Sequence, residues 1–217
     1  MTHRLALAGA LATIALVVLP PLAPMAGQLF AAHMAQHLLI IVVAAPLLVL
    51  SRTIPIEERA FLNPLFQPAT AWLLFVGTFL LWHWPVAFQW AARNEASRLL
   101  EHGTILCTAF LFWSVALSRR DEPSYGARVL FVMTAAIATD LPGVIMVFAP
   151  QAICTMPHEN AYRWGLTPLE DQQIAGLLMW VPANLAFFSI ATWLFARWIS
   201  GDGRPATPSS PSRLVIT

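Results

Sequence analysis

The stretch LFAAHMAQHLLIIVVAAPLLVL, residues 29–50, decides the class of fold to which this chain belongs. It is long and apolar enough for a helix that crosses a bilayer, which needs about 20 such residues. It nevertheless carries two histidines, His33 and His37, four positions apart. On an α-helix this spacing places both imidazoles on one face, one turn apart. Because polar groups in hydrocarbon are costly, the pair predicts a compensating partner elsewhere in the chain.

The composition of the whole chain is that of a membrane protein. Of the 217 residues, 58% are hydrophobic and only 11% are charged, whereas soluble domains contain about 25% charged residues. The formal net charge of +1 gives no basis for nucleic-acid binding. No GxSxG motif or other arrangement of nucleophile and base is present in the sequence. We therefore expect a protein of the lipid bilayer that is not an enzyme.

Apolar runs predict an all-α integral membrane protein with a bundle of six transmembrane helices. The runs cover about 5–22, 28–50, 69–90, 97–118, 127–149 and 172–198. We expect a single transmembrane domain over residues 1–200 and a disordered cytoplasmic tail over 201–217, which is rich in Pro, Ser and Gly. The first run could also be a signal peptide, but APMAG is a poor cleavage site and favours a retained helix.

The arginines predict the orientation of this bundle. With the N-terminus in the cytoplasm, nine arginines fall on the inner side: Arg4, Arg52, Arg59, Arg119, Arg120, Arg128, Arg197, Arg204 and Arg213. Three fall on the outer side: Arg93, Arg98 and Arg163. Loops that remain in the cytoplasm carry an excess of positive charge. The pattern therefore predicts that both termini are inside.

This topology gathers most of the histidines at the outer face of the membrane. The histidines concerned are His33 and His37 in the second helix, His83 in LWHWP, His102 in EHGTILC, and His158 in the last outer loop. Intramembrane ionisable groups usually face a bundle interior and mark a functional site. Four imidazoles at similar depth on three helices therefore predict one shared polar site. Asp171, which begins the last helix in TPLEDQQ, and Asp140 lie near it.

The chemistry of these side chains favours a metal ion. Neutral imidazoles bind copper, zinc, iron and nickel, and carboxylates such as Glu101 or Asp171 can orient the rings or balance charge. Because only neutral imidazole is a ligand, metal binding should weaken as the pH falls through about 6. Soft donors in the loop CTMPH, at Cys154, Met156 and His158, would suit Cu(I) if that loop were extended.

Three alternatives to a copper site remain open from the residues alone. Haem would need two opposed histidines on facing helices, such as His37 with His102 or His83. A proton relay could run through Asp140, the histidines and Asp171. An assembly scaffold would bind no metal at all.

Four motifs carry a resemblance to a known family. HMAQH, LWHWP, LEHGTILCTAFLFW and above all RWGLTPLEDQQIAGLLMWVP resemble the polytopic CtaG-like cytochrome c oxidase assembly factors of bacteria, over roughly residues 28–198. The resemblance implies a multi-pass protein of the bacterial cytoplasmic membrane that handles copper for a haem–copper oxidase. It implies oxidase subunits and a periplasmic copper carrier as partners.

The resemblance also implies which residues form the metal site. The histidine motifs of the family match at His33, His37, His83 and His102, and its acidic position in the last helix matches Asp171. One departure concerns the outer loop: after FAP this chain reads QAICTMPHENAY, where the family usually has an aromatic LY. Any role of that loop is therefore particular to this chain.

Overall fold

The computed structural model describes residues 3–53, 64–118, 124–154 and 158–200, with the side chains of residues 158–160 left aside. Within these ranges every regular element is a helix, which confirms the all-α prediction. The elements are α1 (His3–Val18), α2 (Leu22–Ala26), α3 (Phe30–Leu39), the π-helix η1 (Ile40–Ala44), α4 (Ala45–Ser51), the 3-10 helix η3 (Pro64–Phe66), α5 (Pro68–Trp82), α6 (Pro85–Ala92), α7 (Glu95–Ala116), α8 (Tyr125–Phe148), α9 (His158–Arg163) and α10 (Pro168–Ile199). The tail predicted over 201–217 lies outside the described residues.

The number of membrane spans is only partly that predicted from sequence. Among the described residues, four segments are long and apolar enough to cross a bilayer: Phe30–Ser51, Glu95–Ala116, Tyr125–Phe148 and Pro168–Ile199. α5 and α6 pass the same test only together, and they are bent by 73° at the break between them. The continuous span expected over 69–90 is therefore two helices. α1 has 16 residues and is shorter than a span, so six spans remain a prediction.

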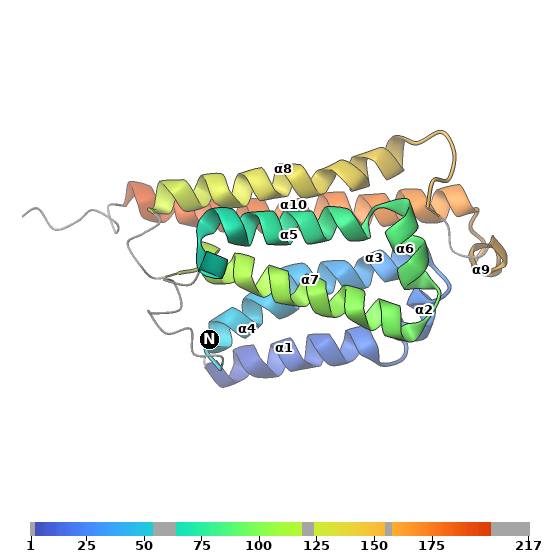
Figure 1. Ribbon diagram of the computed structural model, residues 1–217, viewed down its shortest axis with the longest axis horizontal. Helices are drawn as coiled ribbons and strands as arrows, with labels where there is room; N and C mark the ends of the chain where they lie inside the picture. Colours follow the sequence, from blue (N-terminus) through green and yellow to red (C-terminus); the bar gives the residue numbers. More distant parts are fainter. Residues whose placement is uncertain (1–2, 54–63, 119–123, 155–157, 201–217) are drawn as a thin grey trace, which may run out of the picture.

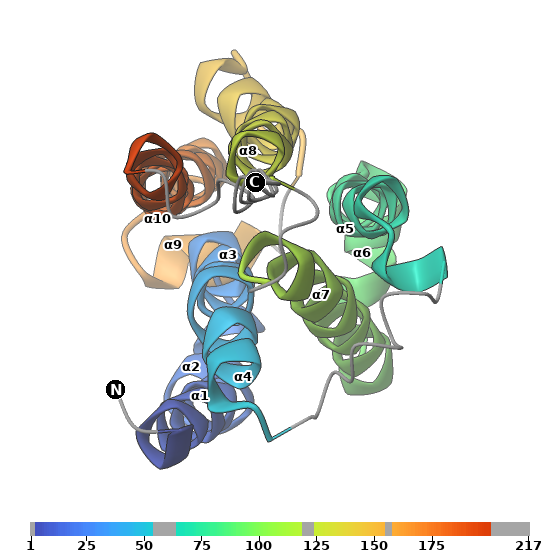
Figure 2. The ribbon, with the colours of Figure 1, turned by 90° about the vertical axis from the view of Figure 1, so that its left-hand side faces the viewer.

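The long helices run side by side along the molecule (Figure 1). The short helices α2, α6 and α9 lie together at one end, which we call the site end. The start of α1 and the end of α10 lie at the opposite end (Figure 1), as expected if both termini are on one side of a membrane. Viewed along the bundle, α3 lies between α1, α7 and α10 (Figure 2), so its side chains face neighbours on several sides.

A π-helical turn interrupts the segment formed by α3 and α4. Pro46 follows η1 and lacks the N–H that would bond to the Val42 carbonyl in an α-helix. The wider turn accommodates the proline ring. The indole Nε1 of Trp113 in α7 donates to the Ile41 carbonyl oxygen at 2.7 Å. This buried bond fixes the middle of the segment to α7, one turn after His37.

α8 and α10 cross at two glycines, which allow their backbones to come very close. A Cβ on Gly176 would lie 2.7 Å from the Gly143 carbonyl oxygen, and one on Gly143 would lie 3.1 Å from the Gly176 carbonyl oxygen. Small residues at such crossings are typical of membrane helices. The contact holds the N-terminal half of α10, which also packs on α3.

Candidate metal centre

Buried polar side chains from two helices meet near the site end of the bundle. α3 supplies His33 and His37, and α7 supplies Glu101 and His102. His33 and Glu101 have no exposed surface, and the other two are buried as well. A ligand atom from each of the four residues lies within 4.8 Å of every other. The histidines that the sequence predicts to converge on α3 and α7 therefore do so in the structure.

Glu101 lies between the two imidazoles of α3. One carboxylate oxygen is 3.2 Å from His33 Nε2, and the other is 3.3 Å from His37 Nε2. The spacing of His33 and His37 along α3 places their ring centroids 4.6 Å apart. His102, next to Glu101 in the sequence, has its ring centroid 5.3 Å from that of His37. The Glu101 carboxylate thus contacts both imidazole rings of α3, and the His102 ring of α7 lies beside them.

His83 lies beside this group but is not one of its four members. It follows the last residue of α5, where the chain turns into α6, and its ring centroid is 5.4 Å from that of His37. Its Nδ1 lies 2.6 Å from the Phe79 carbonyl oxygen. Because a carbonyl only accepts, Nδ1 carries the proton and Nε2 keeps a free lone pair. No described atom is hydrogen-bonded to that buried Nε2.

The structure places Asp171 at the start of α3 and not among the imidazoles. Its Oδ2 accepts from the Phe30 backbone N–H at 2.8 Å, and its Oδ1 accepts from the Ala31 N–H at 2.9 Å. Helix starts have amides without partners, and a carboxylate there also complements the helix dipole. Asp171 therefore positions the helix that carries His33. From the sequence, either Glu101 or Asp171 could orient the imidazole rings. In the structure it is Glu101 that lies beside them.

The rest of the LTPLEDQQ motif also binds backbone. Thr167 and Glu170 form a capping box that begins α10, with Pro168 in the first turn. The Gln172 side chain accepts from the amides of Ile153 and Cys154 and donates to a carbonyl at the end of α8. The motif that carries most of the family resemblance thus joins α10 to α3 and to the loop after α8.

The start of α7 has its own side-chain caps. Asn94 accepts from the Ser97 backbone N–H at 2.9 Å, as expected for an N-cap residue. The Ser97 hydroxyl donates back to the Trp90 carbonyl in α6 at 2.9 Å. These bonds fix the turn between α6 and α7 one helical turn before Glu101. The position of the Glu101 carboxylate is therefore set by the capped start of α7 that precedes it.

Two other predicted sites are not joined to the cluster by the described residues. The Cys154 thiol is buried, and burial raises its pKa to about 11, which disfavours the thiolate that binds metals. Met156 and the side chain of His158 lie outside the described residues. Asp140 accepts from Asn184 Nδ2 through both oxygens at 2.9 Å. The soft-donor loop and the proton relay both stay predictions.

The donor geometry suits a small ion. Ligands at about 2.05 Å from a tetrahedral ion lie about 3.3 Å apart, and both contacts of Glu101 already have this spacing. The ring nitrogens of His33, His37 and His102 include buried atoms with no hydrogen-bond partner among the described residues. A haem would need its flat macrocycle between two opposed imidazoles. The Glu101 carboxylate lies against two of the rings, which favours an ion over haem.

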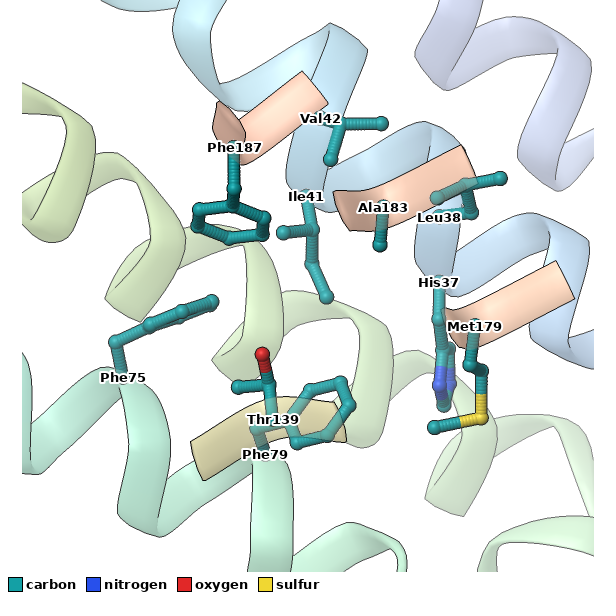
Figure 3. Close-up of a pocket in the computed structure, with 10 residues that line it drawn as sticks. All are labelled: His37, Leu38, Ile41, Val42, Phe75, Phe79, Thr139, Met179, Ala183 and Phe187. Atoms are coloured by element: carbon teal, nitrogen blue, oxygen red, sulfur yellow. The ribbon is translucent and has the colours of Figure 1, made fainter. Parts of the chain in front are cut away.

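An apolar cavity borders His37 on the interior of the bundle (Figure 3). Aromatic and aliphatic side chains of η1, α5 and α10 line it, among them Ile41, Phe75 and Phe187. Its volume of about 20 Å³ holds at most a single water. Met179 lines the same cavity (Figure 3). The cluster is thus bordered on this side mainly by apolar side chains.

Fold and cluster together define a polytopic helical membrane protein with a buried histidine and carboxylate centre. The sequence profile of the cytochrome c oxidase caa3 assembly factor family (Caa3_CtaG) matches residues 2–201. The chain therefore belongs to this family, which confirms the resemblance drawn from its motifs. Searches against curated proteins and against solved structures found no match.

Proposed function

We propose that this protein binds a copper ion at His33, His37, His102 and Glu101 and supplies it to a cytochrome c oxidase during assembly. The family supports the role in oxidase assembly. The observation that supports metal binding is the buried cluster, in which four donor atoms lie within 4.8 Å of one another. Copper is then a cargo that the protein holds and releases, and no catalytic step is required.

His83 has a supporting part in this proposal. Its proton is fixed on Nδ1 by the Phe79 carbonyl, so that Nε2 is available as a donor. Its ring lies next to that of His37. We infer that His83 supplements His37 as a transient ligand while the ion is held in the centre. Asp171 acts through α3, which it caps, and not as a ligand.

The charge of Glu101 favours a monovalent ion. A carboxylate inside a membrane is costly unless a positive charge compensates it. Cu(I) would leave the centre neutral, whereas a divalent ion would leave one uncompensated positive charge. Three imidazoles and a carboxylate also form a suitable donor set for Zn²⁺. The link to oxidase assembly favours copper, and both metals must be measured.

The proposal includes the predicted topology. α1 would be the sixth crossing, both termini would lie in the cytoplasm, and the site end would face the outside of a bacterial cytoplasmic membrane. The arginine pattern and the common location of the two chain ends support this arrangement (Figure 1). A periplasmic copper carrier could then reach the site end, and the oxidase subunits would share the bilayer.

The test is the metal content of the purified protein. Copper and zinc are measured by mass spectrometry after equilibration with Cu(I) under reducing conditions, and a visible spectrum is recorded on the same sample. We compare the wild type with Glu101→Gln and with a variant in which His33, His37 and His102 are alanine. His3→Ala is the matched control, because His3 is exposed and its ring contacts the Leu50 carbonyl, away from the cluster.

We expect about one copper per wild-type chain, the same for His3→Ala, none for the triple variant, and weaker retention for Glu101→Gln. Size-exclusion profiles and tryptophan fluorescence show whether each variant is folded. Stoichiometric zinc without copper would mean that the cargo is zinc. A folded wild type that binds neither metal would overturn the proposal and favour the metal-free scaffold, and a strong Soret band would favour haem.

A further inference from the structure

A second cavity lies on the α7 side of the cluster and has a different character from the apolar one. It is lined by residues of α1, α2, α3 and α7, and its volume is about 170 Å³. A single water needs about 10–15 Å³ of such space, so this cavity has room for several waters. It is large enough for an ion that has kept part of its hydration shell.

The lining of this cavity runs from exposed to buried residues. Glu95, Leu99 and Val18 are exposed and lie toward the ends of their helices at the site end. Gln36 and His102 line the same cavity and are buried. Because His102 is also one of the four cluster residues, the cavity joins the surface to the centre through a shared side chain.

Gln36 provides a polar atom at the buried side of this cavity. Its Nε2 donates to the Val17 carbonyl oxygen at 2.6 Å, which fixes the orientation of the amide. Its Oε1 is buried and has no hydrogen-bond partner among the described residues. A buried amide oxygen without a partner is unfavourable. This residue lies between His33 and His37 in the sequence, and only its polarity within an apolar run could have indicated a role.

We propose that the copper ion reaches and leaves the cluster through this cavity between α1 and α7, with Gln36 Oε1 as a transient ligand before His102. The inference rests on the proposed function, since it concerns the path of the same cargo. The other neighbouring cavity is too small and apolar to carry a hydrated ion. We call the space lined by Gln36, Glu95, Leu99 and His102 the access cavity.

Charge at the mouth of the access cavity controls the rate in this proposal. Glu95 and Arg98 are both among the residues that line it. A carboxylate attracts a passing cation and a guanidinium repels it, most strongly at low ionic strength. Glu95→Gln should therefore slow loading and Arg98→Gln should accelerate it, each by a few-fold, with both effects reduced in high salt.

The decisive experiment narrows the cavity and measures rates and affinity separately. Leu99→Trp places a large side chain in the lining, and Leu100→Trp is the matched control, since Leu100 is similarly exposed on α7 but does not line the cavity. Val18→Trp narrows the opposite wall, in case Leu99→Trp disturbs α7. Cu(I) is offered as its bicinchoninate complex, and the loss of that colour gives the loading rate.

We expect loading and release to slow by at least tenfold in Leu99→Trp and Val18→Trp, with the equilibrium affinity unchanged within about threefold. A narrower path slows loading and release by the same factor and leaves the affinity unchanged, whereas damage to the cluster changes the affinity. Gln36→Leu should also slow both rates. Wild-type rates in both tryptophan variants would overturn the path and leave the proposed function intact. A wild type that takes up no metal would overturn both.

Discussion

Replacing Asp171 with alanine should lower the free energy of unfolding by about 2–6 kcal/mol. The carboxylate is the acceptor for the Phe30 and Ala31 amides, and both amides are buried at the start of a helix inside the protein. Each buried donor that loses its partner costs about 1–3 kcal/mol. Asp171→Asn keeps one acceptor oxygen and should lose about half as much.

The assay is equilibrium unfolding in mixed micelles, titrated with SDS and followed by tryptophan fluorescence. Glu170→Gln is the control, because Glu170 is exposed and glutamine also completes a capping box. Copper affinity is measured on the same samples. We expect it to fall in parallel with stability, since α3 carries two of the proposed ligands.

The opposite pattern would refute this reasoning. If Asp171→Ala kept the wild-type stability but abolished copper binding, Asp171 would be a ligand or charge partner of the ion, as its place in the sequence motif suggested. If Asp171→Asn were as stable as the wild type and Asp171→Ala were not, the hydrogen bonds would matter and the negative charge would not.

Three further outcomes follow from other contacts. Gly176→Ala should lower the free energy of unfolding by about 1–3 kcal/mol, since its Cβ would lie 2.7 Å from the Gly143 carbonyl oxygen. Gly77 has open space around it, so Gly77→Ala should not destabilise the protein. SDS unfolding compares the two variants. Trp113→Phe removes the indole donor from the η1 carbonyl and should cost about 1–3 kcal/mol in the same assay. Cys154, with a pKa of about 11, has about 0.1% thiolate at pH 8, so iodoacetamide should label it slowly until the protein is unfolded.

Much of the architecture could be predicted because a bilayer requires long apolar helices. The runs around residues 97–118 and 127–149 match α7 and α8 within two residues. The break after α5 was less visible, since His83 and Pro85 indicate a helix end but not a bend of 73°. The π-turn before Pro46 gives no periodic signal of its own, because a proline in an apolar run indicates a helix break or kink but not the widened turn that accommodates it.

The cluster was predictable to the level of its helices. The spacing of His33 and His37 fixes them on one face of any α-helix, and placing them beside His102 needed only neighbouring helices with a common orientation. Which acid lies beside the imidazole rings could be decided only from the three-dimensional structure. Glu101 and Asp171 were both plausible, and rotation of α7 and the crossing of α10 over α3 decide which one faces the rings.

The side chains of LTPLEDQQ affect the proposed metal centre through their hydrogen bonds to backbone groups. Asp171 fixes the first turn of α3, and Trp113 fixes the segment again at Ile41. His33 and His37 lie between these two attachments, so the rotation of their shared face toward α7 is set at both ends. A motif of helix-capping side chains can therefore determine ligand geometry without containing a ligand. By this argument, variants in the motif should alter copper affinity only to the extent that they loosen α3.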